Sequence, residues 1–306
     1  MKMINNGVYP TMVTPFTDDN KIDYNGVKEL LKWYEEKGVD GIFAICQSSE
    51  KFFLSFEERL ELLKFVMANK PEGMSIVASG HTSDDLDVQI EEAKAFIETG
   101  IDAYVFISNR FAKEDESDDV LLERMEYVAN ALPDVQFGVY ECPYPYKRVL
   151  TPYVLRKMAE SGKYTFIKDT CCDLSKIKEK LDAVKGSPIK IYNANAATLL
   201  ESLRMGCDGY SGVMANFHPD LYSKLIKANN EGDNEKAEFL QNLLGFFSVT
   251  ECQCYPVNAK YYLTLDGLNI TYNSRARSAA ELTQSRRLEI EQMYAFTKEI
   301  KKKYCL

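Results

Sequence analysis

The chain has 306 residues, of which 45% are hydrophobic and 27% charged, and its formal net charge is −9. This balance is typical of a soluble globular protein, and no apolar run approaches the ~20 residues that span a bilayer. Residues 1–7 lack the apolar core of a signal peptide, so we expect a cytoplasmic protein. An acidic chain gains no affinity from counterion release, which argues against nucleic acid as a partner.

From residue 7 to about residue 229, short β-branched or aromatic runs alternate with longer segments of helical spacing. Such alternation predicts parallel strands, because each crossover returns the chain to the same edge of the sheet. Eight units, ~25–30 residues apart, predict a closed (β/α)8 TIM barrel. The glycine-rich turn of an open dinucleotide-binding sheet is absent after the first run. The predicted strands cover residues 7–14, 40–46, 74–79, 101–108, 135–140, 164–169, 189–192 and 207–213.

Capping signals predict where several helices begin and end. Ser55 and Glu58 form a capping box for a helix over residues 55–69, and we expect the same device at Ser83 for residues 83–98. The segment 24–37 has an apolar face at helical spacing. Gly38, Gly100, Gly162 and Gly206 predict left-handed helix ends, and Thr151-Pro152 predicts a helix start.

After residue 230 the alternation stops. Residues 234–247, 258–265 and 279–303 have helical spacing with no strand between them. We interpret residues 1–230 as the barrel and residues 231–306 as a C-terminal helical extension packed on it within one structural domain. Packing or an oligomer contact is the role expected for this extension.

Reactive groups of a barrel lie at the carboxyl ends of its strands. Lys168 ends the sixth predicted strand, where loss of water would lower the pKa of its ammonium and free an amine to attack a carbonyl. A lysine that reaches solvent or pairs with Asp169 is the alternative. Tyr140 ends the fifth strand and is a candidate for proton transfer, with a satisfied core aromatic as the alternative.

Polar residues at other strand ends are candidates for binding a substrate. Ser48 and Ser49 follow the second strand, where hydroxyls and turn amides suit a carboxylate, and Ser211 ends the eighth. The chain has only two histidines, His81 and His218, too few for a histidine-rich metal site. We expect neither metal nor cofactor, although magnesium held by carboxylates stays open as an alternative. The eight scattered cysteines indicate reduced thiols.

These residues form a familiar set, and along essentially its whole length the chain resembles the dihydrodipicolinate synthase/N-acetylneuraminate lyase family of barrel enzymes. Residues 7–16 are similar to the family's first strand, and residues 166–170 are similar to its Schiff-base strand. Tyr140, with Pro143 three residues later, resembles the family's tyrosine strand. The resemblance implies that Lys168 condenses with a 2-oxo acid, that Tyr140 transfers protons, and that the protein is a tetramer built of dimers.

The second-strand motif departs from the family pattern of glycine, two hydroxyl residues, glycine and glutamate. Residues 46–50 read Cys-Gln-Ser-Ser-Glu, so Ser48 matches the hydroxyl that binds the pyruvate carboxylate. Gln47 replaces the other hydroxyl residue and Ser49 the second glycine; we count both as candidate substrate contacts. Phe111 replaces a relay tyrosine, at a position where the family packs an aromatic ring across the dimer.

The contact for a second substrate also differs. Pro145 stands where the synthases have an arginine that binds the aldehyde substrate. Arg110, Lys147 and Arg148 are candidates for a different anion contact, with a solvated surface charge as the alternative for each.

We therefore expect a lyase or aldolase that makes or breaks a carbon–carbon bond in a pyruvate-type 2-oxo acid through an imine on Lys168. The expected partner is an aldehyde or a sugar acid. Two alternatives stay open: a dehydratase of a deoxy sugar acid that uses the same imine, and a barrel that binds a 2-oxo acid without turnover.

Overall fold

The computed structural model describes residues 4–251 and 253–306. Residues 1–3, from the predicted start of the chain, and Cys252, from the predicted extension, lie outside the described residues. Along the described part, no helix is both long and apolar enough to cross a bilayer.

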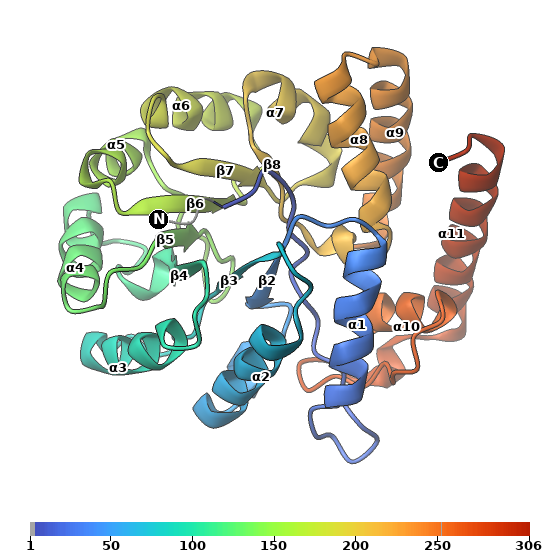
Figure 1. Ribbon diagram of the computed structural model, residues 1–306, viewed down its shortest axis with the longest axis horizontal. Helices are drawn as coiled ribbons and strands as arrows, with labels where there is room; N and C mark the ends of the chain where they lie inside the picture. Colours follow the sequence, from blue (N-terminus) through green and yellow to red (C-terminus); the bar gives the residue numbers. More distant parts are fainter. Residues whose placement is uncertain (1–3, 252) are drawn as a thin grey trace.

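Eight parallel strands form the sheet, in the order β1-β8-β7-β6-β5-β4-β3-β2. The ring is closed between its first two strands by a parallel bridge from Thr11 to Phe43 and by a hydrogen bond from Phe43 N to Pro10 O. The (β/α)8 TIM barrel predicted from the alternation is therefore confirmed (Figure 1). The strands are β1 Gly7–Val8, β2 Gly41–Ile45, β3 Ser75–Ala78, β4 Ala103–Ile107, β5 Phe137–Tyr140, β6 Tyr164–Asp169, β7 Lys190–Asn193 and β8 Gly209–Tyr210.

Within the described residues, eight helices alternate with these strands and three more form the extension, which lies beside α8 and α1 in Figure 1. The barrel helices are α1 Tyr24–Glu36, α2 Phe56–Asn69, α3 Leu86–Ile97, α4 Asp118–Asn130, α5 Pro152–Ser161, α6 Leu174–Val184, α7 Leu199–Met205 and α8 Pro219–Glu231. The extension contains α9 Asn234–Phe247, α10 Val257–Leu265 and α11 Gln284–Lys303. That the extension and the barrel form one structural domain stays a prediction.

Two predicted helix starts and two predicted strands need correction. The capping box at Ser55 is present, but α3 begins at Leu86 because Asp85, not Ser83, accepts the hydrogen bonds of the first turn. The helix predicted over 279–303 is divided into a 3-10 turn and α11, which Thr283 caps. The ladders of β1 and β8 are only two residues long, much shorter than the predicted 7–14 and 207–213.

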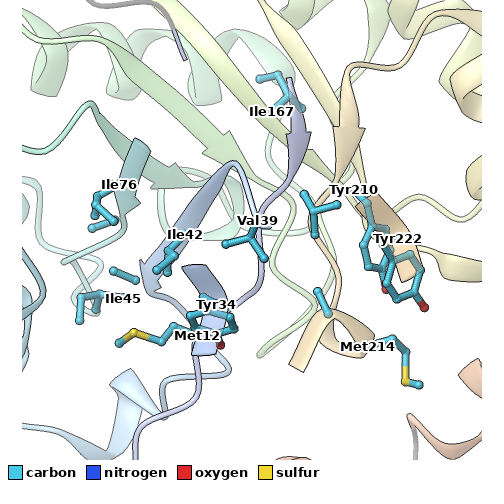
Figure 2. Packing of buried hydrophobic residues seen from close by; sticks show 14 of the residues in the cluster. Met12, Tyr34, Val39, Ile42, Ile45, Ile76, Ile167, Tyr210, Met214 and Tyr222 are labelled. Carbon is cyan, nitrogen blue, oxygen red and sulfur yellow. The ribbon is translucent and has the colours of Figure 1, made fainter. Parts of the chain in front are cut away.

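The apolar side chains separate into an outer and an inner cluster, because successive residues of a strand point to opposite faces. Figure 2 shows part of the outer cluster, in which Ile42, Ile76 and Ile167 of the strands belong to the same core as buried residues of the helices. The inner cluster fills the barrel and contains Tyr9, Phe43, Phe166 and Tyr192. These rings contact one another at centroid distances of 4.7–6.0 Å and form an apolar floor below the carboxyl ends of the strands.

Candidate active site

The strand register places the two principal candidates side by side. Tyr140 of β5 is paired with Lys168 of β6, so both side chains lie on the inner face. The residues that follow them, Glu141 and Asp169, point the opposite way and contact Lys180 of α6. The alternative in which Lys168 pairs with Asp169 is therefore wrong, because the two side chains are on opposite faces of β6.

Lys168 is a buried amine without a counter-charge in hydrogen-bonding reach. Its side chain is 4% exposed, and Nζ lies 4.2 Å from the Tyr140 ring centroid and 5.8 Å from that of Phe43. No described residue accepts a hydrogen bond from Nζ. Burial lowers the pKa of Lys168 below its usual 10.5, because the apolar surroundings disfavour the ammonium form. The lowered pKa increases the fraction of neutral amine, which is the nucleophilic form.

Tyr140 is hydrogen-bonded to Gln47, the residue that replaces a hydroxyl residue in the second-strand motif. Its hydroxyl donates to Gln47 Oε1 at 3.3 Å, and the Cys142 thiol approaches the same oxygen at 3.6 Å. The single thiol proton of Cys142 also has Tyr144 O in reach at 3.5 Å, so the bond from Tyr140 is the contact that restrains the carboxamide. Burial raises the pKa of Tyr140 well above its usual 10, so this phenol stays protonated.

A cavity of about 730 Å³ opens above Lys168, large enough for a small substrate. The cavity is lined by five residues that the sequence proposed: Gln47, Ser48, Tyr140, Lys147 and Lys168. Six lining residues come from the C-terminal extension: Ser248, Glu251, Tyr255, Pro256, Ala276 and Arg277. The extension therefore forms part of the cavity wall, a role that the sequence reasoning did not assign to it.

The turn after β2 directs the Ser48 side chain to the cavity and the Ser49 side chain away from it. Ser48 lines the cavity and donates to Thr11 Oγ1 at 3.0 Å. The Ser49 hydroxyl instead donates to Cys46 O and accepts from Cys46 N, so both of its hydrogen bonds stay within the turn. The Ser49 side chain is fully buried and is not part of the cavity wall, so a substrate contact by Ser49 stays a prediction that this geometry does not support.

Of the three cations proposed for anion contact, only Lys147 lines the cavity. Its Nζ donates to Thr170 O at 2.7 Å and forms no ion pair with a described residue. Arg110 is not at the cavity, because its guanidinium pairs with Asp84 at 2.9 Å and lies over the Phe52 ring. Arg148 is buried, and it donates to the carbonyl oxygens of Lys113 and Glu116. Both arginines are bound by groups of the protein, and neither lines the cavity.

Ser211 is another predicted contact that the structure places elsewhere. Its side chain is fully buried and is absent from the cavity wall, where Gly212 stands instead. A Cβ atom at position 212 would lie 2.2 Å from the Tyr210 hydroxyl and 2.6 Å from Ala194 O, so the wall accommodates only glycine there.

Phe111 lies inside its own chain, although the resemblance implied a contact across a dimer. The side chain is fully buried, with ring centroids 4.9 Å from Phe106 and 5.5 Å from His81. Packed in this way, Phe111 has no surface left for a neighbouring subunit. The homo-oligomer itself stays a prediction.

Glu50 joins the β2 turn to the extension. Its carboxylate accepts from Lys260 Nζ at 2.6 Å, from Ser274 Oγ at 2.8 Å and from Arg275 N at 2.6 Å. This contact fixes the segment that contains Ala276 and Arg277 at the cavity. Sequence reasoning missed it because the partners are more than 200 positions apart, and no local pattern records such a pairing.

Among the described residues, no group of three or more His, Cys, Asp and Glu side chains is arranged to hold a metal ion.

The comparison with known families decides the classification. The model of the Dihydrodipicolinate synthetase family matches residues 5–295. The chain belongs to this family. A curated relative, the 4-hydroxy-tetrahydrodipicolinate synthase of Haloarcula marismortui, is 24% identical over 262 residues, which cover 85% of this chain and 84% of the relative. Membership makes the chain a lyase-type enzyme of the dihydrodipicolinate synthetase family.

Solved structures of other proteins share the fold. YagE, a prophage protein from E. coli K12 described in complex with pyruvate, superposes with a TM-score of 0.86 at 23% identity, over 96% of this chain and 98% of that one. CdNal from Clostridium difficile, in complex with mannosamine, gives a TM-score of 0.84 at 18% identity, over 94% and 99% of the two chains. At these identities the superpositions establish the barrel and its extension, and substrates need separate arguments.

Proposed function

We propose that this enzyme is a Schiff-base aldolase or lyase in which Lys168 forms an imine with a pyruvate-type 2-oxo acid. The observation that carries the proposal is the state of Lys168. Its amine is buried, has no counter-charge in hydrogen-bonding reach, has a lowered pKa and faces a cavity of substrate size. The pyruvate complex of YagE supports the choice of acid.

The reaction follows from the amine and its neighbours. The neutral Lys168 nitrogen attacks C2 of the 2-oxo acid, and loss of water gives a protonated imine. When the bond between C3 and C4 breaks, its electron pair forms the C2=C3 double bond and the π pair of the C=N bond moves onto the lysine nitrogen, which gives an enamine. C4 departs as an aldehyde as its hydroxyl loses a proton to water in the open cavity. The Tyr140 ring lies beside Lys168 Nζ, and in this proposal Tyr140 exchanges a proton with the hydroxyl of the carbinolamine. In this proposal Ser48 redirects its hydroxyl proton from Thr11 Oγ1 to the carboxylate of the bound acid.

Lys147 is the proposed contact for an anionic group on the second substrate. It lines the same cavity as Lys168 and has no carboxylate partner among the described residues, so its charge is available to a ligand. Arg277, also on the wall, is partly neutralised by Glu281 at 3.0 Å. An aldehyde or sugar acid with its own carboxylate fits this arrangement.

Reduction of the imine tests the proposal. The protein is incubated with pyruvate and sodium borohydride, digested and mapped by mass spectrometry. We expect one adduct, on Lys168, and none in the Lys168→Ala variant. Lys178→Ala is the matched control, because this exposed lysine of α6 pairs only with Asp182 and its loss should leave the adduct unchanged. Absence of an adduct with pyruvate and with other 2-oxo acids would refute the Schiff-base mechanism.

A further inference from the structure

Glu251 brings a second ionisable group from the extension to the cavity of Lys168. It follows the 3-10 turn Ser248–Thr250, between α9, which packs along α8, and α10 (Figure 1). Glu251 and Glu50 are the two carboxyl residues on the described wall of the cavity. Glu50 is fully engaged with Lys260 and the 274–276 segment, which leaves Glu251 as the acid that faces a ligand.

The Glu251 carboxyl group has no fixed role in the fold. It is half-buried, and within residues 4–251 and 253–306 no group donates a hydrogen bond to it or forms an ion pair with it. Burial raises the pKa of Glu251 above its usual value, and the positive charge of nearby Lys168 offsets only part of this rise. The mutual influence places both groups within electrostatic reach across one cavity. A half-buried carboxyl without a structural partner is a candidate for acid–base catalysis.

Tyr140 is poorly suited to the proton transfer at carbon. Its hydroxyl proton is directed to Gln47 Oε1, and a carboxamide oxygen accepts a hydrogen bond without having a proton to pass on. A carboxamide thus ends the relay where a hydroxyl would continue it. In addition, the pKa of Tyr140 lies well above 10, so its phenolate form is scarce near neutral pH. A carboxylate with a raised pKa is the more effective base under these conditions.

We propose that the Glu251 carboxylate removes a proton from C3 of the 2-oxo acid held as an imine on Lys168, and returns it when the enamine is protonated. This step rests on the function proposed above. The C3–H electron pair forms the C2=C3 double bond, and the π pair of the C=N bond moves onto the lysine nitrogen. The neutral carboxyl group that results holds the proton and exchanges it with solvent through the open cavity. Tyr140 retains the proton transfers at oxygen.

Deuterium exchange of pyruvate isolates this step without a second substrate. In D2O, formation and reprotonation of the enamine replace the methyl protons of pyruvate, and proton NMR follows the loss of their signal. We expect the whole chain to catalyse this exchange and Glu251→Gln to slow it about 100-fold or more, the size of a general-base contribution. Trapping of pyruvate on Lys168 with borohydride should persist in Glu251→Gln.

Matched variants separate the possible outcomes. Glu235→Gln, an exposed glutamate in the first turn of α9, should exchange at the parent rate, and Glu251→Asp should retain more exchange than Glu251→Gln. Unchanged exchange in Glu251→Gln would overturn the inference, as would an imine without exchange in the parent protein. Loss of both trapping and exchange in Glu251→Gln would also overturn it, because the residue would then act before the carbon proton. Failure of the parent protein to form any imine would instead refute the proposed function.

Discussion

Two buried lysines on opposite sides of the same strand have opposite electrostatic surroundings. Lys168 points from β6 into the barrel, where its amine meets aromatic rings and has no carboxylate in hydrogen-bonding reach. Lys180 reaches β6 from α6 and contacts both Glu141 and Asp169, all three side chains being almost fully buried. Because Glu141 follows Tyr140 and Asp169 follows Lys168, the alternation of the strands separates the two environments.

The pKa values of Lys168 and Lys180 shift in opposite directions because only Lys180 has carboxylate partners. Burial lowers the pKa of Lys168, and the opposing influence of Cys46, Cys142 and Glu251 does not offset it. Burial acts in the same direction on Lys180, but the carboxylates of Glu141 and Asp169 outweigh it and raise the pKa of that lysine above 10.5. One lysine is therefore held as an ion that joins the strand layer to the helix layer. The other is kept as a potential nucleophile, and the comparison shows that burial alone does not decide the protonation state.

Removal of Lys180 is expected to give the largest change in stability. In Lys180→Met, Glu141 and Asp169 remain buried without their counter-charge, and we expect the free energy of unfolding to fall by about 3–5 kcal/mol. Lys168→Met is the matched control, because it removes an ammonium that has no carboxylate partner. We expect this variant to lie within about 1 kcal/mol of the parent or to be more stable. Urea unfolding followed by circular dichroism measures both, and equal losses would contradict the comparison.

The pH dependence of imine formation tests the lowered pKa of Lys168. The rate of adduct formation with pyruvate should rise with pH as the amine loses its proton, and level off below pH 10.5. Between the folded pKa of Lys168 and 10.5, the unfolded chain binds more protons at this residue than the folded chain. The contribution of Lys168 to stability therefore increases with pH across that window. A rate that is half-maximal at pH 10.5 or above would show that the amine is not activated.

The barrel and the position of Lys168 were predictable because they depend on local patterns. Alternating strands and helices identified the parallel barrel, and the two-residue period of β6 placed Lys168 on the inner face with Ile167 on the outer one. Capping residues worked where a single choice was available, as at Ser55, and failed at residues 83–85, where Asp85 offers a better acceptor than Ser83.

The remainder of the site depends on contacts between distant segments. Arg277 reaches the cavity because Glu50 binds the 274–276 segment across more than 200 positions, and Glu251 reaches it from the turn after α9. Helical periodicity in the extension carries no information on either placement. The same limit explains Arg110, whose partner Asp84 belongs to the preceding loop of the barrel. Sequence patterns locate the end of a strand, but they do not show which neighbouring residue pairs with the side chain at that end.

The smallest expected effect concerns Gln47, which fixes the phenol beside Lys168. Gln47→Leu removes the acceptor of the Tyr140 hydroxyl while it retains much of the side-chain volume. One lost hydrogen bond of about 1 kcal/mol corresponds to roughly a fivefold slower adduct formation with pyruvate. Cys142→Ala is the matched control, since it removes the thiol beside Gln47 and leaves the bond to Tyr140, so its effect should be smaller. Initial rates of borohydride trapping measure both variants. Faster trapping in Gln47→Leu would mean that the carboxamide restrains Tyr140 in an orientation unfavourable to the imine, and that orientation of the phenol, rather than the environment of Lys168, limits the rate.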